Sequence, residues 1–265
     1  MAKATAVLDS LAQRGEATPA QLAELAGEPR STIHRLLSTL EELDLVEPGR
    51  RRGTCMLGFK LFQLGTTVVS RFDERQAALP VMERIHEDIG ETTFLCIRRG
   101  DEGVCIERLD GKQVNLRTLS LGGSLPLHAG SAPRALLAFA PPAAWDDYLQ
   151  RADPQAFTAK PFAIPDAVIE ELHATRDRGY AISDQDITPG VASLGAPIFD
   201  HAGAVRAALS IGGLRDPILG PGSRALELLR NGATEISRTL DHMEESAAGC
   251  RRQGRHPPRA WRAVG

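Results

Sequence analysis

Basic and hydroxyl side chains gather on one face of a segment near the N-terminus. From residue 29 onward, apolar positions recur with helical spacing on one side of a helix: Ile33, Leu36, Leu37, Leu40 and Leu43. The opposite side, near the helix start, presents cations and short polar groups: Arg30, Ser31, Thr32, His34, Arg35 and Ser38. Such side chains reach phosphates and base edges when a helix enters the major groove N-terminus first. The spacing therefore predicts a DNA-recognition helix.

A second cationic cluster follows this helix. Arg50, Arg51 and Arg52 lie between Leu45-Val46 and Cys55-Met56-Leu57, which read as the two strands of a hairpin. Taken alone, three arginines in a turn are more often a solvated loop. Their place shortly after a recognition helix favours a wing, whose cations contact the DNA backbone or the minor groove.

The elements that must hold this helix can also be read from the sequence. Residues 4–13 have an amphipathic helical pattern that ends at Gly15. Thr18-Pro19-Ala20-Gln21 has the form of a capping box with proline at the first helical position, and Gly27 suits the end of that second helix. Three helices and a basic hairpin together predict a winged helix-turn-helix.

Length and charge place this module within a larger protein. The chain has 265 residues, with 42% hydrophobic and 25% charged residues, which indicates a globular protein of two domains. Residues 1–66 carry eight basic and eight acidic side chains, residues 67–246 carry 18 and 26, and residues 247–265 carry five arginines and no acid. Because the net charge is −3, indiscriminate coating of nucleic acid is excluded and DNA contact must come from local basic faces.

The sequence also argues against export and membrane insertion. It has no apolar stretch approaching the ~18 residues of a membrane span, and residues 1–15 lack the pattern of a secretory signal. The four cysteines, Cys55, Cys96, Cys105 and Cys250, are scattered and form no CxxC pair. We therefore expect a cytoplasmic protein with reduced thiols and no membrane partner.

The second half mixes strands and helices. Residues 66–90 read as one helix, with an apolar stripe at Leu79, Met82, Ile85 and Ile89. Strands are expected at 92–98, 104–108, 114–117, 191–199 and 204–211, and helices at 132–139, 165–178 and 227–245. Hairpin-type links between strands indicate an α+β fold with an antiparallel sheet.

Both halves resemble the IclR family of bacterial transcriptional regulators. RSTIHRLLSTLEELDLVEP followed by MLGFKLFQLG is similar to the family's DNA-binding module, over residues 4–66. LPLHAGSAPRALLAF and RGYAISDQDITPGVASLGAPIFD resemble two segments of its effector-binding domain, which has a GAF-like architecture. Two positions depart from the family pattern: Pro133-Arg134 replaces Gly-Lys, and Asp186 replaces glutamate.

The resemblance implies four parts. We expect a winged helix-turn-helix domain at 1–66, a linker helix at 67–78, an effector-binding domain at 79–246 and a disordered basic tail at 247–265. The implied function is that of a ligand-responsive regulator, with repression as the expected mode, on palindromic double-stranded operator DNA. One module is too small for regulatory affinity, so a homodimer or a dimer of dimers is expected.

The resemblance also implies an effector site in the second domain. Its predicted wall consists of Leu116, Leu127, Gly130, Ser131, Ala132, Ser183, Ser193, Leu194, Ser210 and Gly212. Hydroxyl groups and the backbone N–H groups of Gly130-Ser131-Ala132 suit a small organic acid above a leucine floor. Relatives often carry aspartate at Ser183 and cysteine at Ser193, so the loss of an acid favours an anionic ligand over an amine.

Other classes of function fit less well. Ser131 lies three residues from His128, but Gly130-Ser131-Ala132-Pro133 lacks the Gly-x-Ser-x-Gly elbow of a hydrolase. The seven histidines have no metal-ligand spacing, so we expect neither a metal nor a cofactor. A domain that acts purely through protein contacts is the third alternative, and a ligand-dependent shift in DNA affinity would exclude it.

Overall fold

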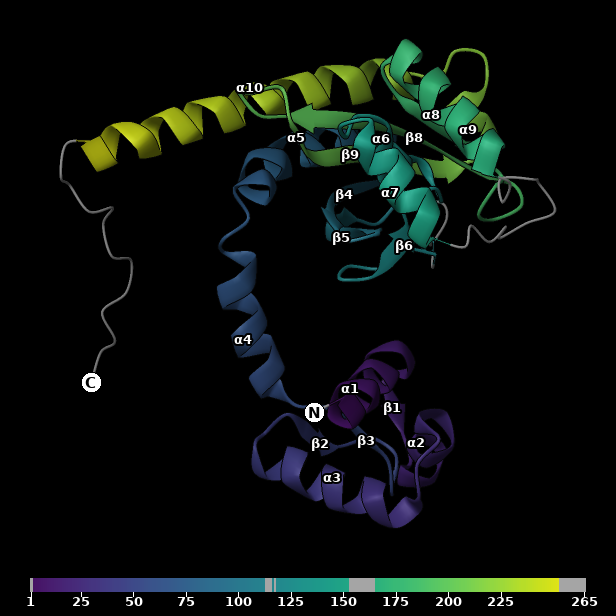
Figure 1. The fold of residues 1–265 in the computed structure, drawn as a ribbon, viewed down its shortest axis with the longest axis vertical. Helices are drawn as coiled ribbons and strands as arrows, with labels where there is room; N and C mark the ends of the chain where they lie inside the picture. Colours follow the sequence, from purple (N-terminus) through teal and green to yellow (C-terminus); the bar gives the residue numbers. More distant parts are fainter. Residues whose placement is uncertain (1, 113–115, 117, 153–164, 253–265) are drawn as a thin grey trace. The chain divides into compact units, whose positions relative to one another are not determined.

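The computed structural model describes residues 2–112, 116, 118–152 and 165–252. The chain divides into two compact units, residues 1–72 and residues 73–265. Each unit has its own secondary structure and its own core (Figure 1).

The N-terminal unit is a winged helix-turn-helix, as predicted. Its elements are α1 (Ala2–Arg14), β1 (Glu16–Ala17), α2 (Pro19–Ala26), α3 (Arg30–Glu42), β2 (Val46–Pro48), β3 (Cys55–Leu57) and α4 (Phe59–Val69). The three strands form an antiparallel sheet in the order β1-β3-β2.

Local chemistry accounts for the bounds of these helices. The Thr18 hydroxyl accepts from the N–H of Gln21 while the Gln21 side chain accepts from the N–H of Thr18, so the predicted capping box forms at α2. Gly27 ends α2 in the left-handed conformation, with φ of 62°. The predicted apolar face of α3 buries Ile33, Leu37 and Leu40, whereas Leu43 is 56% exposed.

The single helix expected over residues 66–90 is two helices. α4 ends at Val69 and α5 (Asp73–Ile89) begins after a short break. Asp73 and Glu74 occupy the first turn of α5, where acidic side chains favour a helix start by interacting with its dipole. The break coincides with the division between the two units at residue 72.

The C-terminal unit has the expected α+β architecture with an antiparallel sheet. Six strands pair in the order β6-β5-β4-β9-β8-β7. Their bounds are β4 (Thr92–Arg99), β5 (Glu102–Leu109), β6 (Ser124–Pro126), β7 (Ala181–Asp184), β8 (Val191–Phe199) and β9 (Val205–Leu214). The helices are α5, α6 (Ser131–Ala138), α7 (Ala143–Arg151), α8 (Pro165–Arg178), α9 (Arg215–Leu219) and α10 (Ala225–Arg252).

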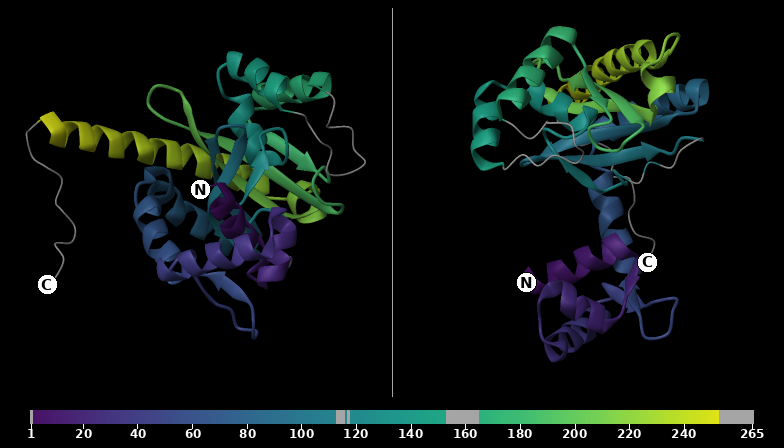
Figure 2. Two further views of the ribbon diagram at one scale, coloured as in Figure 1. Left: turned by 60° about the horizontal axis from the view of Figure 1, so that its bottom comes forward. Right: turned by 90° about the vertical axis from the view of Figure 1, so that its right-hand side faces the viewer.

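Helices cover the sheet of the C-terminal unit (Figure 2), and the surroundings of two glycines show where α6 and α10 approach it most closely. A Cβ atom at Gly195 of β8 would lie 2.5 Å from the carbonyl oxygen of Ser131, so the start of α6 rests directly on this strand. A Cβ atom at Gly232 of α10 would meet Ile85 of α5 and Leu209 of β9 at 2.8 and 3.2 Å. The start of α6 therefore packs directly on β8, whereas α10 packs against α5 and β9.

Two expected segments differ from the structure or lie beyond it. Residues 114, 115 and 117 of the expected strand lie outside the described residues, and Leu116 is buried but not in a strand. α10 continues to Arg252, so residues 247–252 of the expected disordered tail are helical, and residues 253–265 lie outside the described residues. In the described part of the chain, every helix is too short or too polar to cross a membrane.

Candidate DNA interface and effector cavity

The predicted recognition face of α3 is open to solvent. Arg30, Ser31, His34, Arg35 and Ser38 are exposed, and Thr32 is half-buried. Arg30 and Arg35 form no ion pair with any residue that the structure describes. Their charges are therefore available to a polyanion, and the buried aliphatic side of α3 holds the helix in place.

The three arginines of the wing differ from one another. Arg51 forms an ion pair with Glu16 of β1, whose carboxylate also accepts hydrogen bonds from the Arg51 N–H at 3.2 Å and the Thr54 hydroxyl at 3.0 Å. The hydrogen bond from this N–H is the main reason that the pKa of Glu16 is lowered from its usual value. Arg50 and Arg52 are exposed and unpaired among the described residues.

Glu16 was missed by the sequence analysis. Its partners lie 35 and 38 residues away, and only the pairing of β1 with β3 brings them near. The carboxylate ties the wing turn to the sheet and neutralises one of its three cations. Two unpaired arginines therefore remain at the tip.

The recognition helix and the wing border one cleft. It has a volume of about 360 Å³, and its wall includes His34 and Ser38 of α3 together with Gly53 and Thr54 of the wing. Two segments that the sequence assigned separately to DNA contact therefore lie on the same side of this unit.

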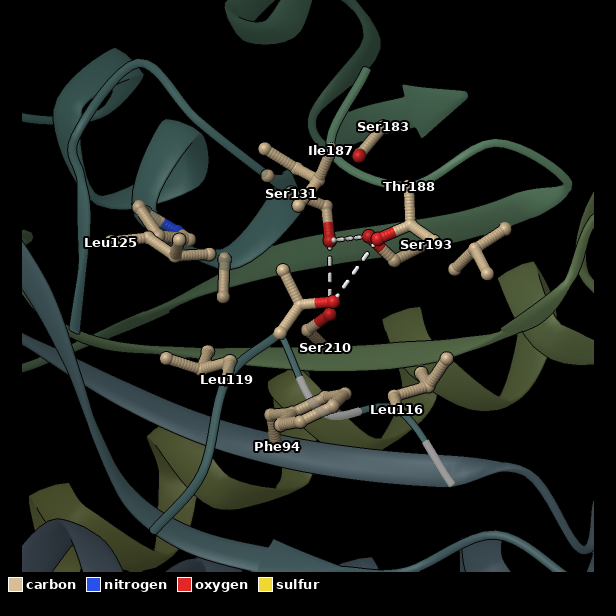
Figure 3. A pocket seen from close by; sticks show the side chains of 15 residues that line it. Phe94, Leu116, Leu119, Leu125, Ser131, Ser183, Ile187, Thr188, Ser193 and Ser210 are labelled. Atoms are coloured by element: carbon tan, nitrogen blue, oxygen red, sulfur yellow. Dashed lines mark hydrogen bonds between the residues drawn. The ribbon is translucent and has the colours of Figure 1, made fainter. Parts of the chain in front are cut away.

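The C-terminal unit contains a small cavity between the start of α6 and the sheet (Figure 3). Its volume is about 60 Å³. The polar side chains in its described wall are all hydroxyls: Thr118, Ser131, Ser183, Thr188, Ser193 and Ser210. The apolar part of the wall consists of Phe94, Leu116, Leu119, Leu125, Ala132, Pro133, Ile187 and Val191, with Gly130 at the helix start.

Three serines from three elements meet at the floor of the cavity. The Ser131 hydroxyl at the start of α6 donates to Ser193 of β8 at 2.7 Å. Ser131 and Ser210 of β9 are joined by a second hydrogen bond of 2.9 Å, visible with the first in Figure 3. Because Ser131 has one proton and gives it to Ser193, Ser210 must be the donor in the second bond.

The start of α6 adds backbone donors. Gly130, with φ of 76°, leads into the helix and lines the cavity beside Ser131 and Ala132. The first N–H groups of a helix have no acceptor within it, so α6 itself leaves those of Ser131 and Ala132 without a partner. Gly195 permits this approach of α6 to β8, since any side chain there would collide with the Ser131 backbone.

A buried ion pair lies directly behind the wall. Arg134 of α6 and Asp186 are 2% and 3% exposed and approach to 2.5 Å. Arg134 also donates to the carbonyl oxygens of His128 and Ile182, so its guanidinium group binds two backbone carbonyls as well as the carboxylate. The other carboxylate oxygen of Asp186 accepts from the Ser183 hydroxyl.

This pair joins the two departures from the family pattern. Arginine replaces lysine at 134 and the shorter aspartate replaces glutamate at 186, and the two side chains are partners. The longer cation reaches the shorter anion. The two residues are 52 positions apart, so their pairing is not evident from the sequence.

Seven of the ten predicted effector residues line the cavity, namely Leu116, Gly130, Ser131, Ala132, Ser183, Ser193 and Ser210. Leu127 and Leu194 do not: Leu127 is fully buried in the hydrophobic core, and Leu194 lies on the opposite face of β8 from Ser193 because side chains alternate along a strand. Gly212 is not part of the wall but adjoins it, since an added Cβ would lie 3.2 Å from Cβ of Ser193 and 3.4 Å from Cδ1 of Leu116.

Several wall residues were missed by the sequence analysis: Phe94, Thr118, Leu119, Leu125, Pro133, Ile187, Thr188 and Val191. Phe94 is the register partner of Ser210 across β4 and β9, so a correct strand pairing would have found it. Thr118 and Thr188 are joined by a hydrogen bond of 3.1 Å, although they are 70 residues apart. The residues next to each threonine in the sequence form no pattern that would predict this contact.

The described side-chain hydrogen bonds of Ser131 join it to two other hydroxyls, Ser193 and Ser210, and neither of these is a base that would activate a nucleophile. The Nδ1 atom of His128 is 2.6 Å from the hydroxyl oxygen of Tyr148, whose pKa is raised by burial. No group of three potential metal ligands occurs among the residues that the structure describes.

A winged helix-turn-helix with a cationic recognition face, carried with a separate domain that has a small cavity lined by apolar side chains and hydroxyls, defines a DNA-binding transcriptional regulator. The chain belongs to the IclR family of bacterial transcriptional regulators. The family's helix-turn-helix domain matches residues 1–49, and its C-terminal domain, described as "Bacterial transcriptional regulator IclR C-terminal", matches residues 66–238.

Named regulators are among its relatives. The chain is 29% identical to the HTH-type transcriptional regulator KipR of Bacillus subtilis, over 91% of this chain and 96% of KipR. It is 31% identical to the HTH-type transcriptional repressor AllR of Escherichia coli K12, over 80% of this chain and 79% of AllR.

Solved structures agree with this assignment. The IclR protein of Thermotoga maritima is 29% identical, with a TM-score of 0.73 over 90% of this chain and 97% of its own. An IclR homologue from Microbacterium hydrocarbonoxydans, complexed with 4-hydroxybenzoate, is 28% identical, with a TM-score of 0.77 over 91% and 98% of the two chains.

Proposed function

We propose that this protein is a ligand-responsive repressor that binds a palindromic operator as a homodimer, or as a dimer of dimers, and releases it when a small organic acid occupies the cavity. The observation that carries the proposal is the hydroxyl-lined cavity at the start of α6, in a chain whose other unit presents unpaired cations on α3 and the wing. The coupling is a free energy between two binding sites rather than a chemical reaction.

The wall of the cavity supports an acid as the ligand. Serine hydroxyls and the first N–H groups of α6 are hydrogen-bond donors that suit a carboxylate. No carboxylate side chain lines the described wall, so a cationic amine finds no counter-ion there. The relative that binds 4-hydroxybenzoate shows that a protein of this fold takes an aromatic acid.

Helix α4 supports a dimer with a second copy of this chain. None of its residues is buried. Four of them are apolar side chains that are each more than half exposed: Phe59, Phe62, Leu64 and Val68. An isolated helix of 11 residues with so much apolar surface is marginal in water, so we expect it to be covered. A second copy is the occupant that two-fold symmetric DNA requires.

The test is a Ser193→Leu variant examined for both DNA binding and ligand response. Leucine would fill much of the 60 Å³ cavity and remove one hydroxyl, while the DNA-binding unit is untouched. We expect unchanged operator affinity and loss of the shift caused by a short carboxylate such as propionate, measured by fluorescence anisotropy. A folded variant that still responds would place the effector site elsewhere.

The same measurement separates the alternatives. A domain that acts only through protein contacts would leave operator affinity independent of every acid tested. Turnover of ester substrates that is lost in Ser131→Ala would instead indicate a hydrolase.

A further inference from the structure

The hydrogen-bonding roles of the serines in the cavity can be assigned from their partners. Ser131, Ser193 and Ser210 together have three protons, and the two bonds among them use two. Since Ser131 donates to Ser193 and Ser210 donates to Ser131, the remaining proton is that of Ser193. Ser193 therefore offers a donor to a ligand.

Ser183 has the opposite role. Its hydroxyl donates to Asp186, whose carboxylate is held by Arg134 and accepts but cannot donate. Ser183 has no second proton, so the face of its oxygen that lines the cavity can only accept. A ligand carbonyl or carboxylate oxygen placed there would meet lone pairs, whereas a ligand hydroxyl would form a hydrogen bond.

The donor and the acceptor are neighbours. Ser183 of β7 and Ser193 of β8 are directly paired in the strand register, and both line the cavity. Side chains paired in this way have Cβ atoms about 4.5–5.5 Å apart. A carboxylate and a hydroxyl on adjacent carbon atoms can reach both serines, whereas a hydroxyl across a benzene ring from the carboxylate extends beyond them.

The size of the cavity favours the same ligands. A water molecule needs roughly 10–15 Å³ of such volume, so a cavity of about 60 Å³ holds only a few ligand atoms. We propose that this chain selects short 2-hydroxy acids over the corresponding unsubstituted and 2-oxo acids, with Ser183, positioned by Asp186 and Arg134, as the specificity-determining residue. The inference rests on the proposed function of this cavity as the effector site.

The experiment compares three acids of the same length on the full-length protein by isothermal titration calorimetry: each enantiomer of lactate, propionate and pyruvate. We expect one enantiomer of lactate to bind about threefold to tenfold more tightly than propionate, the range of one net hydrogen bond, and pyruvate to bind no better than propionate. In Ser183→Ala the ratio of lactate affinity to propionate affinity should fall to about one, because the only acceptor proposed for the ligand hydroxyl is removed. Thr239→Ala, on the exposed side of α10, is the control and should keep the wild-type preference.

The outcomes separate this inference from the proposed function. Equal binding of all three acids, or a preference for lactate that persists in Ser183→Ala, overturns the inference and leaves the effector site in place. Absence of binding by all three acids and by 4-hydroxybenzoate overturns the proposed ligand class, and this inference with it. Thermal melting of each variant shows that the comparison is made on folded protein.

Discussion

Arg134 and Asp186 form a buried pair in which each side chain is matched to the length of the other. Arg134 contacts Asp186, the carbonyl of His128 and the carbonyl of Ile182, which come from the segment after β7, the loop before α6 and β7. Removing one member of a buried pair leaves the other charge uncompensated, and this costs about 3–5 kcal/mol. A substitution that changes the length of either side chain should therefore also lower the free energy of unfolding.

The first prediction concerns replacement of Arg134 and Asp186 by lysine and glutamate, the residues typical of the family. Arg134→Lys and Asp186→Glu should each lower the free energy of unfolding by about 1–3 kcal/mol, since one shortens the cation and the other overfills the site. The double variant should lose less free energy of unfolding than the two single variants together, by about 0.5–3 kcal/mol, because lysine then pairs with the longer glutamate. Urea denaturation of the four proteins measures this difference, and strictly additive losses would show that the two substitutions are independent.

The second prediction concerns Arg35 on the exposed face of α3. If this guanidinium contacts a base edge, Arg35→Ala should weaken operator binding by about 1–3 kcal/mol and binding to random duplex by much less. Competition binding with operator and scrambled DNA at one salt concentration measures both. Equal losses on the two duplexes would reduce Arg35 to a phosphate contact.

At the scale of elements, the wing combines one neutralised and two unpaired arginines. Glu16 of β1 accepts from the backbone and side chain of Arg51, so the turn is fixed by an ion pair that spans two strands. The tip residues Arg50 and Arg52 have no such partner within the described residues. Their charge is therefore the part of the wing that DNA phosphates can use.

The third prediction follows from this difference. Replacing Arg50 and Arg52 together with alanine should flatten the dependence of log K on log salt by about two units, one for each phosphate contact. Arg51→Ala is the matched control and should change the slope less, since Glu16 already neutralises that cation. If Arg51→Ala reduced the salt slope by one full unit, as expected for a lost phosphate contact, the ion pair with Glu16 would have to open when DNA binds.

At the scale of the whole molecule, the apolar surface of α4 needs a partner. Phe59 and Phe62 are both 63% exposed, with their ring centroids 5.3 Å apart. Each unit has a separate buried core, and α4 contributes no buried residue. The proposed partner is a second copy, which would also place two recognition helices on one operator.

The fourth prediction tests this partner. Phe62→Asp should convert the dimer to monomer and reduce operator affinity by at least about tenfold, because a second recognition helix is lost. Gln63→Asp, on the same helix and also exposed, is the control and should keep the wild-type mass. Sedimentation equilibrium measures the mass, and an unchanged dimer in Phe62→Asp would place the interface elsewhere.

The amino-acid sequence by itself determined the winged helix-turn-helix, the antiparallel α+β sheet and the exposed side of α3. These features follow from local periodicity, capping and turn residues, since Thr18-Pro19-Ala20-Gln21 and the aliphatic spacing of α3 act within a few positions. Seven residues of the cavity wall were also among the predicted effector residues, but this came from the family resemblance rather than from spacing. The single helix over 66–90 was wrong, because apolar periodicity does not show where one helix stops and the next begins.

Only the tertiary structure decided which of these side chains meet. Ser131, Ser193 and Ser210 come from three elements, and Asp186 reaches Arg134 from 52 residues away. Such contacts depend on strand register and on the close approach of α6 to Gly195, and neither leaves a pattern in neighbouring residues. Hydrogen bonds between distant segments are set by where the folded backbone places them, so the donor and acceptor roles in the cavity could be assigned only after folding.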